Sequence, residues 1–240
     1  MNYGLQLYSV RDLTKENLEE AIEKVAKLGY ENVEFAGFMG RTAEQVNAML
    51  KANGLTLSGT HSSLDDLINN YDETVAFHKA IGNKYYILPS YRLSNQAEID
   101  YFVEKVNEII PKLEKEGITL AFHNHARECV PNADGSVALE QMIYRTDIKF
   151  EIDTYWAFVG MKNPVDLITR LKDRIVRIHI KDGSPDGKGM PLGMGDAPVK
   201  DVYDKAIELG FLMVVESETC NPSGMAEAEI CINYLKSLEK

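Results

Sequence analysis

Residues 3–36 read YGLQLYSVRDLTKENLEEAIEKVAKLGYENVEFA, and this stretch indicates a strand, a helix and a second strand. The two apolar ends are typical of strands, and the middle carries apolar side chains on one helix face, namely Leu18, Ile22, Val25 and Leu28. A helix that connects two such strands favours a parallel sheet. The turn after the first strand, LYSVRD, has none of the glycines of a dinucleotide-binding loop.

The same alternation continues to the end of the chain. Strands are predicted at residues 3–8, 32–36, 56–60, 85–88, 119–123, 149–153, 176–180 and 212–216. Helices are predicted at about 15–29, 42–54, 65–81, 96–115, 137–144, 164–172, 200–209 and 226–238. Eight such units in 240 residues predict one α/β domain over residues 1–240, a (β/α)8 TIM barrel with its active site at the carboxyl ends of the strands. An open doubly wound sheet is the alternative.

Composition narrows the class of protein. The 45% hydrophobic content is that of a soluble globular chain, and no apolar run approaches a membrane span. A formal net charge of −11 disfavours nucleic-acid and anionic-membrane partners. Three widely spaced cysteines and an N-terminus without signal-peptide features predict reduced thiols and a cytoplasmic location.

Polar side chains lie where most of the predicted strands end. Apolar runs lead into imidazoles and acids: His61, His123, His125, Asp153, His179, Glu216 and Glu218. A buried strand normally stays apolar, because an unpaired polar group out of water costs several kcal/mol. Since residues two apart share a strand face, these groups are expected to converge at one mouth of the barrel. Imidazole nitrogens and carboxylate oxygens suit Mn, Zn, Co or Mg without separating them.

Seven segments resemble the sugar phosphate isomerase/epimerase family, whose members have the xylose isomerase-like TIM barrel. They are GLQLYSVRD (4–12), VEFAGF (33–38), FHNHARE (122–128), EIDTYW (151–156), HIKDG (179–183), LGMGDAPV (192–199) and VVESE (214–218). The resemblance covers nearly the whole chain in order, so it implies the family's fold. It leaves the reaction open, because relatives include ketose 3-epimerases, hydroxypyruvate isomerases and inosose dehydratases.

Relatives of the ketose epimerase type bind one divalent ion through a Glu, an Asp, a His and a second Glu. The resemblance places Asp153, His179 and Glu216 at the last three positions. The first position falls near Ala121, which has no ligand atom, and His123 is expected to take its place. The resemblance therefore implies a site for one divalent metal ion formed by His123, Asp153, His179 and Glu216.

The family's chemistry is proton transfer next to a carbonyl in a sugar or polyol. In this chain it implies three catalytic residues: Glu216 as ligand and base, His125 as acid/base partner or alternative ligand, and Lys181 as the group that neutralises oxyanion charge. Substrate contacts are expected from Gln6, Glu34, His61 and Trp156.

The sequence thus predicts a cytoplasmic, metal-dependent sugar isomerase or epimerase of carbohydrate metabolism. A metal-dependent sugar or inosose dehydratase, which is a lyase, and a non-catalytic sugar-binding barrel are the alternatives. A nuclease of the same fold is disfavoured, because five histidines cannot furnish a three-metal cluster and no basic track is evident. The expected partner is a small sugar or polyol, and a homo-oligomer is compatible with the sequence.

Overall fold

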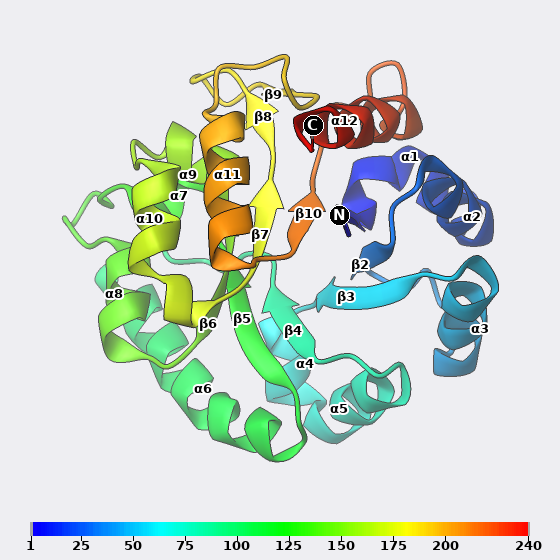
Figure 1. Cartoon of the computed structure of the whole chain (residues 1–240). Coiled ribbons are helices and arrows are strands. Elements are labelled where there is room, and N and C mark those ends of the chain that lie inside the picture. Colours follow the sequence, from blue (N-terminus) through cyan, green and yellow to red (C-terminus); the bar gives the residue numbers. More distant parts are fainter. Residues whose placement is uncertain (1, 240) are drawn as a thin grey trace.

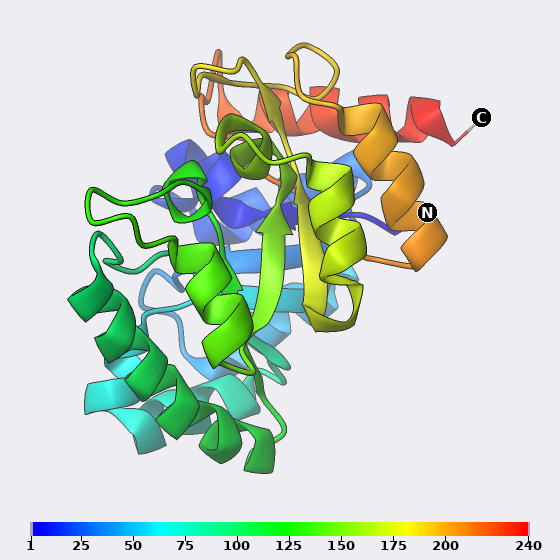
Figure 2. The ribbon, with the colours of Figure 1, turned by 90° about the vertical axis from the view of Figure 1, so that its left-hand side faces the viewer.

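The computed structural model describes residues 2–239, which form a closed barrel of eight strands surrounded by helices (Figures 1 and 2). The strands pair around the barrel in the order β1, β10, β7, β6, β5, β4, β3, β2, and all eight pairings are parallel. Their bounds are β1 Gly4–Gln6, β2 Asn32–Ala36, β3 Thr56–His61, β4 Tyr85–Leu88, β5 Thr119–His123, β6 Lys149–Asp153, β7 Ile175–Ile180 and β10 Met213–Val215. The predicted (β/α)8 barrel is confirmed, and the open sheet is excluded because β1 pairs with both β2 and β10.

The long helices lie on the outside of the barrel, as predicted (Figure 1). They are α2 Leu18–Leu28, α3 Ala43–Asn53, α5 Tyr71–Ala80, α6 Gln96–Lys115, α8 Ala138–Arg145, α10 Pro164–Arg170, α11 Val199–Leu209 and α12 Gly224–Leu238. Each faces the strands with apolar side chains; in α2 these are Leu18, Ala21, Ile22 and Val25. This packing places the main hydrophobic core between the helices and the outer face of the barrel.

Several predicted ends lie one to three residues from those observed, and two differences from the predicted elements have a clear physical cause. The first strand ends at Gln6, because the Gln6 side chain accepts a hydrogen bond from the Tyr8 N–H and starts the 3-10 helix η1, Leu7–Val10. The helix expected over residues 65–81 is two helices, α4 Leu64–Asn69 and α5, because Asn70 between them has non-helical backbone angles.

Several short elements follow the strands at the mouth. They are α1 Arg11–Thr14 after η1, α7 Ala126–Cys129 after β5, α9 Thr154–Val159 after β6, and the hairpin β8 Asp182–Gly183 with β9 Gly189–Met190 after β7. The 3-10 turn η2 Lys172–Arg174 comes before β7, at the other end of that strand. The Asp182 carboxylate accepts backbone N–H bonds from Gly183, Gly193, Gly195 and Ala197. One buried side chain therefore holds the loop that follows the hairpin.

The inside of the barrel is polar toward the carboxyl ends of the strands. Strand alternation sends Leu5, Val33 and Ile178 outward into the hydrophobic core. Inward it sends buried polar side chains that meet across the barrel, among them Gln6, Glu34, Glu151, Asp153, His179 and Lys181. The barrel therefore places charged groups where the core of a protein is usually apolar.

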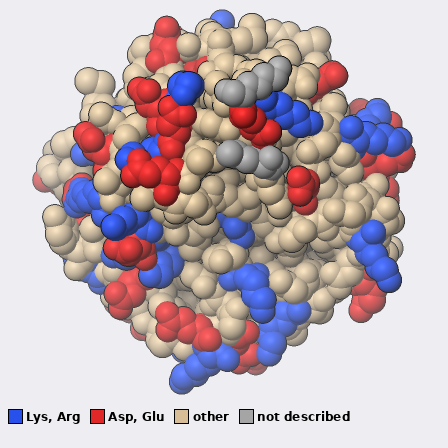
Figure 3. Space-filling view, in the orientation of Figure 1, with Lys and Arg blue, Asp and Glu red and all other residues tan. Residues whose placement is uncertain are grey.

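Within residues 2–239, no helix has the length and apolarity needed to cross a bilayer. On the face shown in Figure 3, acidic and basic side chains are interspersed rather than separated by sign. The surplus of acids in the whole sequence, 37 against 26 Lys and Arg, thus produces no single-sign field on this face.

Candidate active site

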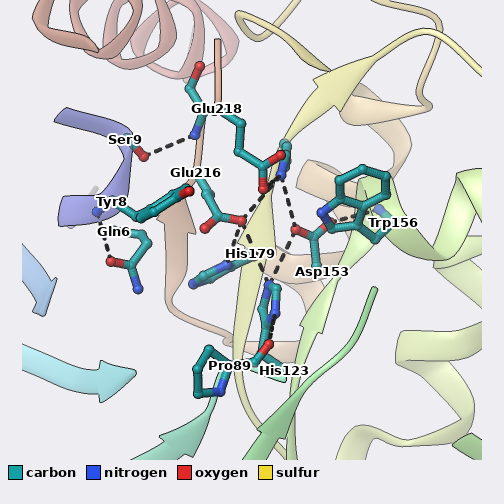
Figure 4. A network of polar contacts seen from close by, with 12 residues as sticks. Gln6, Tyr8, Ser9, Pro89, His123, Asp153, Trp156, His179, Glu216 and Glu218 are labelled. Atoms are coloured by element: carbon teal, nitrogen blue, oxygen red, sulfur yellow. Dashed lines mark hydrogen bonds and ion pairs between the residues drawn. The ribbon is translucent and has the colours of Figure 1, made fainter. Parts of the chain in front are cut away.

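Four side chains from four neighbouring strand ends turn toward one point at the mouth of the barrel (Figure 4). We call them the upper set: His123, Asp153, His179 and Glu216. The His123 Nε2 lies 3.4 Å from Asp153 Oδ2 and 3.7 Å from Glu216 Oε2, and His179 Nδ1 lies 3.5 Å from the same Glu216 oxygen. A tetrahedral site with bonds of about 2.1 Å has ligand atoms about 3.4 Å apart. The spacing therefore fits a single metal ion.

The hydrogen bonding of the upper set fits the same ion. His123 Nε2, Asp153 Oδ2 and His179 Nδ1 are buried, and none has a hydrogen-bond partner in the part of the chain that the structure describes. Buried polar atoms without partners are rare and call for an explanation. Three of them aimed at one point form a group that could hold a divalent metal ion.

Neighbouring groups fix the orientation of these side chains. His123 Nδ1 is 3.3 Å from the Pro89 carbonyl, an arrangement that directs Nε2 toward the site. The other Asp153 oxygen, Oδ1, accepts the N–H of Trp156 and caps α9, so only Oδ2 faces the site. Asn124 points away from the barrel interior, and its side chain bonds both the N–H and the carbonyl of Asp153. These contacts preorganise the upper set.

Lys181 lies at the edge of the upper set and is 1% exposed. Its Nζ is 2.5 Å from Glu218, 3.3 Å from Glu216 and 3.9 Å from Asp153, and it lies over the Trp156 ring. Burial alone would lower the pKa of Lys181, but these carboxylates outweigh burial and raise it. Lys181 is therefore a fixed positive charge at neutral pH.

Glu216 is ionised for a related reason. Burial alone would raise its pKa, but the charges of Lys181 and His179 outweigh burial and hold the pKa well below its usual range. A carboxylate that stays charged at 4% exposure is suited to binding a cation.

A cavity of about 550 Å³ opens above the upper set. It is lined by His61, His123, His125, Trp156, Glu216 and Glu218, with Tyr8 and Arg11 among the other lining residues. Of the predicted site residues, it therefore brings His61, His125 and Trp156 together with two predicted metal ligands. A volume of this size accommodates a monosaccharide.

His125 lies beside the upper set rather than in it. Its ring centroid is 5.0 Å from that of His123 and 5.7 Å from that of Trp156. Burial and the charge of His123 lower the pKa of His125 to about 3, so its imidazole is neutral at physiological pH. A neutral ring with so low a pKa can donate or accept a hydrogen bond, but it takes up a proton only weakly.

Gln6 and Glu34 lie deeper than the sequence predicted. Both are 0% exposed, and the Gln6 amide donates to Glu34 Oε1 at 2.6 Å. Glu34 also contacts His61 and His179, at 3.1 and 2.9 Å. Glu151, for which no role was expected, joins this deeper group. Its position two residues before Asp153, on the same strand face, was the available signal.

The protein is a (β/α)8 barrel. At the carboxyl ends of its strands, imidazoles, carboxylates and one lysine lie beside a cavity large enough for a sugar. The chain belongs to the xylose isomerase-like TIM barrel family, whose sequence model matches residues 22–238.

Individual relatives are distant in sequence. The inosose dehydratase of Clostridium beijerinckii is 23% identical over 195 residues, which are 71% of this chain and 65% of that protein, just under two thirds of its length. A solved sugar phosphate isomerase/epimerase from Parabacteroides distasonis superposes with a TM-score of 0.86 at 22% identity, covering 98% of this chain and 93% of that one. The probable 3-DHS dehydratase of Bacillus anthracis superposes with a TM-score of 0.75 at 13% identity, covering 98% and 99%. At these identities the structural likeness establishes the fold alone.

Proposed function

We propose that the protein is a divalent-metal-dependent isomerase or epimerase that moves a proton next to the carbonyl of a sugar or polyol. The observation that carries the proposal is the upper set, with three unpartnered buried ligand atoms directed at one point beneath a sugar-sized cavity. A divalent ion bound there would act as a Lewis acid on neighbouring substrate oxygens and stabilise the enediolate.

The chain's own residues supply the remaining functions. Glu216, ionised and lining the cavity, is assigned as metal ligand and as the base that removes the carbon-bound proton. Lys181 offsets the negative charge that develops on substrate oxygen, because its ammonium lies beside Glu216. Trp156, next to His125, is placed to stack on the apolar face of a sugar ring.

His123 takes the place of the glutamate that ketose epimerases carry near Ala121. Ala121 is 0% exposed and offers no ligand atom, whereas His123 directs Nε2 into the upper set. His61 remains a proposed substrate contact, since its ring lines the cavity. Gln6 and Glu34 are proposed to act from beneath, through their contacts with His61 and His179.

Dehydration of a sugar or inosose is the second candidate. It is favoured by the lack of an opposed glutamate at position 121, because epimerisation by two carboxylates needs one on each face of the substrate. The similarity to an inosose dehydratase points the same way. In this reaction the same base removes the carbon-bound proton, a carbon–carbon double bond forms as the β C–O bond breaks, and the removed proton is returned to the departing hydroxyl, which leaves as water.

The proposal is tested by isotope exchange with the Mn²⁺-loaded protein in D₂O. Ketoses, their phosphates and inososes are incubated with the protein, and NMR measures deuterium at the carbon next to the carbonyl. Exchange that disappears in Asp153→Asn and persists in the surface control Glu140→Gln supports the proposal. New isomers identify an isomerase or epimerase, whereas loss of water identifies a dehydratase. A protein that binds no Mn²⁺ and catalyses exchange with none of these compounds contradicts the proposal.

The cellular location and the assembly state belong to the same proposal. We expect a cytoplasmic protein, consistent with three cysteines that form no disulfide among the described residues. A homo-oligomer is compatible with this expectation, and size-exclusion chromatography with light scattering would determine it.

A further inference from the structure

A second ring of ligand atoms lies directly beneath the upper set. We call it the lower set: Glu34 of β2, His61 of β3, Glu151 of β6 and His179 of β7. Carboxylate oxygens and imidazole nitrogens alternate around it. His61 Nε2 is 3.1 Å from Glu34 Oε1 and 2.7 Å from Glu151 Oε2, and His179 Nε2 is 2.9 and 3.1 Å from the same two oxygens.

The size of this ring matches a metal ion. A square with sides of about 3 Å has its centre about 2.1 Å from each corner, which is the length of a bond between imidazole nitrogen and zinc. All four atoms lie within 4.8 Å of one another, as a cluster around one centre requires. Two imidazoles and two carboxylates suit Mn, Co or Zn.

The burial of the two glutamates needs a compensating charge. Glu34 and Glu151 are both 0% exposed, and one oxygen of each, Glu34 Oε2 and Glu151 Oε1, has no hydrogen-bond partner within the described residues. Two buried carboxylates that share the same imidazoles repel each other, and a divalent cation between them offsets more negative charge than one protonated imidazole does. Each buried acid also retains a free lone pair, which is unusual for a purely structural network.

Two strands of the ring carry an extra residue opposite the glutamates. In the pairing of β2 with β3, Val33 lies opposite Leu57 and Glu34 opposite Gly59, so Ser58 is the extra residue. In the pairing of β6 with β7, Phe150 lies opposite Ile175 and Glu151 opposite Arg177, so Val176 is the extra residue. Such bulges are common beside active sites. Here they lie on β3 and β7, the strands that carry His61 and His179 of the lower set.

We propose that the lower set binds a second divalent cation, distinct from the ion of the upper set. His179 lies between the two, with Nδ1 in the upper set and Nε2 in the lower. Filling both sites requires both ring nitrogens of His179 to be free of protons, so His179 would bind as a bridging imidazolate and the protons that it carries in the metal-free protein would pass to solvent. The second ion would link four strands of the barrel. It would enter from the cavity past the His61 ring, which lines that cavity. The inference does not depend on the proposed reaction.

The test is the metal content of stripped protein reloaded with Mn²⁺ or Co²⁺, desalted and measured by plasma mass spectrometry. We expect about two ions per wild-type chain and about one in Glu151→Gln, which affects only the lower set. Asp153→Asn affects only the upper set and should also retain about one, and the double variant none. Glu34→Gln is the second lower-set variant if Glu151→Gln is unstable, and Glu140→Gln is the surface control.

Other results separate this inference from the proposed function. One ion in wild type, lost in Asp153→Asn and only bound more weakly in Glu151→Gln, overturns the second site and leaves the upper one intact. One ion lost in Glu151→Gln but kept in Asp153→Asn supports the lower site and contradicts the upper. No ion in wild type overturns both. As an independent measurement, Co²⁺ added to Asp153→Asn should produce visible absorption bands that Asp153→Asn/Glu151→Gln lacks.

Discussion

Replacing Lys181 by methionine should destabilise the metal-free protein strongly. The Lys181 side chain is buried, and three carboxylates, Glu216, Asp153 and Glu218, lie within 3.9 Å of its ammonium. Methionine has a similar length and no charge, so the change leaves these acids uncompensated with little change in packing.

The expected size of the effect follows from burial. Removing one partner of a buried ion pair costs about 3–5 kcal/mol, because the remaining charge stays out of water. For a chain of this length each kcal/mol shifts the melting temperature by about 2–4 °C, so Lys181→Met should melt about 6–20 °C below wild type in EDTA. Saturating Mn²⁺ should reduce the difference, since a bound cation neutralises the same acids.

The assay is thermal unfolding followed by circular dichroism, with and without EDTA. Lys200→Met is the matched control, because Lys200 forms an exposed pair with Asp204 and such pairs contribute at most about 1 kcal/mol. A Lys181→Met protein that melts within about 2 °C of wild type in EDTA would refute the view that this lysine balances the acids of the mouth.

Three further predictions concern other parts of the molecule. Burial lowers the pKa of His78 to about 4, so the unfolded chain takes up the proton first as pH falls. Urea unfolding should therefore show that wild type loses about 3 kcal/mol more stability than His78→Gln between pH 6.5 and 4, and equal losses in the two proteins would count against this assignment. Ala121→Glu should restore Mn²⁺ binding to His123→Ala, with a gain of about tenfold in affinity by calorimetry, and no gain would place His123 among substrate contacts instead. Asp182→Ala leaves four backbone N–H groups of the 183–197 segment without their acceptor, so the free energy of unfolding should fall by an amount on the order of 3 kcal/mol. Hydrogen exchange should rise in this segment while the barrel strands stay protected, and equal exchange in the variant and wild type would contradict this.

Local patterns predicted most of the fold. Strand periodicity located all eight barrel strands, and amphipathic spacing located the long helices, because both signals depend on residues close in sequence. The errors fell where a single side-chain or backbone contact ends an element. The Gln6 side chain ends β1, and the conformation of Asn70 divides the helix expected over residues 65–81. Such contacts are specific to one geometry and leave no periodic trace.

Part of the candidate site could also be predicted from the sequence. Alternation along a strand placed Asp153 and Glu151 on one face, and the family resemblance singled out the four members of the upper set. The metal-binding role of these four residues remains a prediction, although the structure brings them together. The lower set was not anticipated, since Glu34 was expected to meet substrate and Glu151 had no assigned role.

The sequence by itself determined that this chain forms strand–helix units and which side chains of each strand share a face. Only the tertiary structure decided which of those faces meet. Glu34 and His179 are 145 residues apart, and they touch because the barrel closes and because alternation along β2 and β7 sends both side chains inward. Side-chain alternation is a property of a single strand, whereas depth and contact across a barrel depend on how all eight strands are staggered.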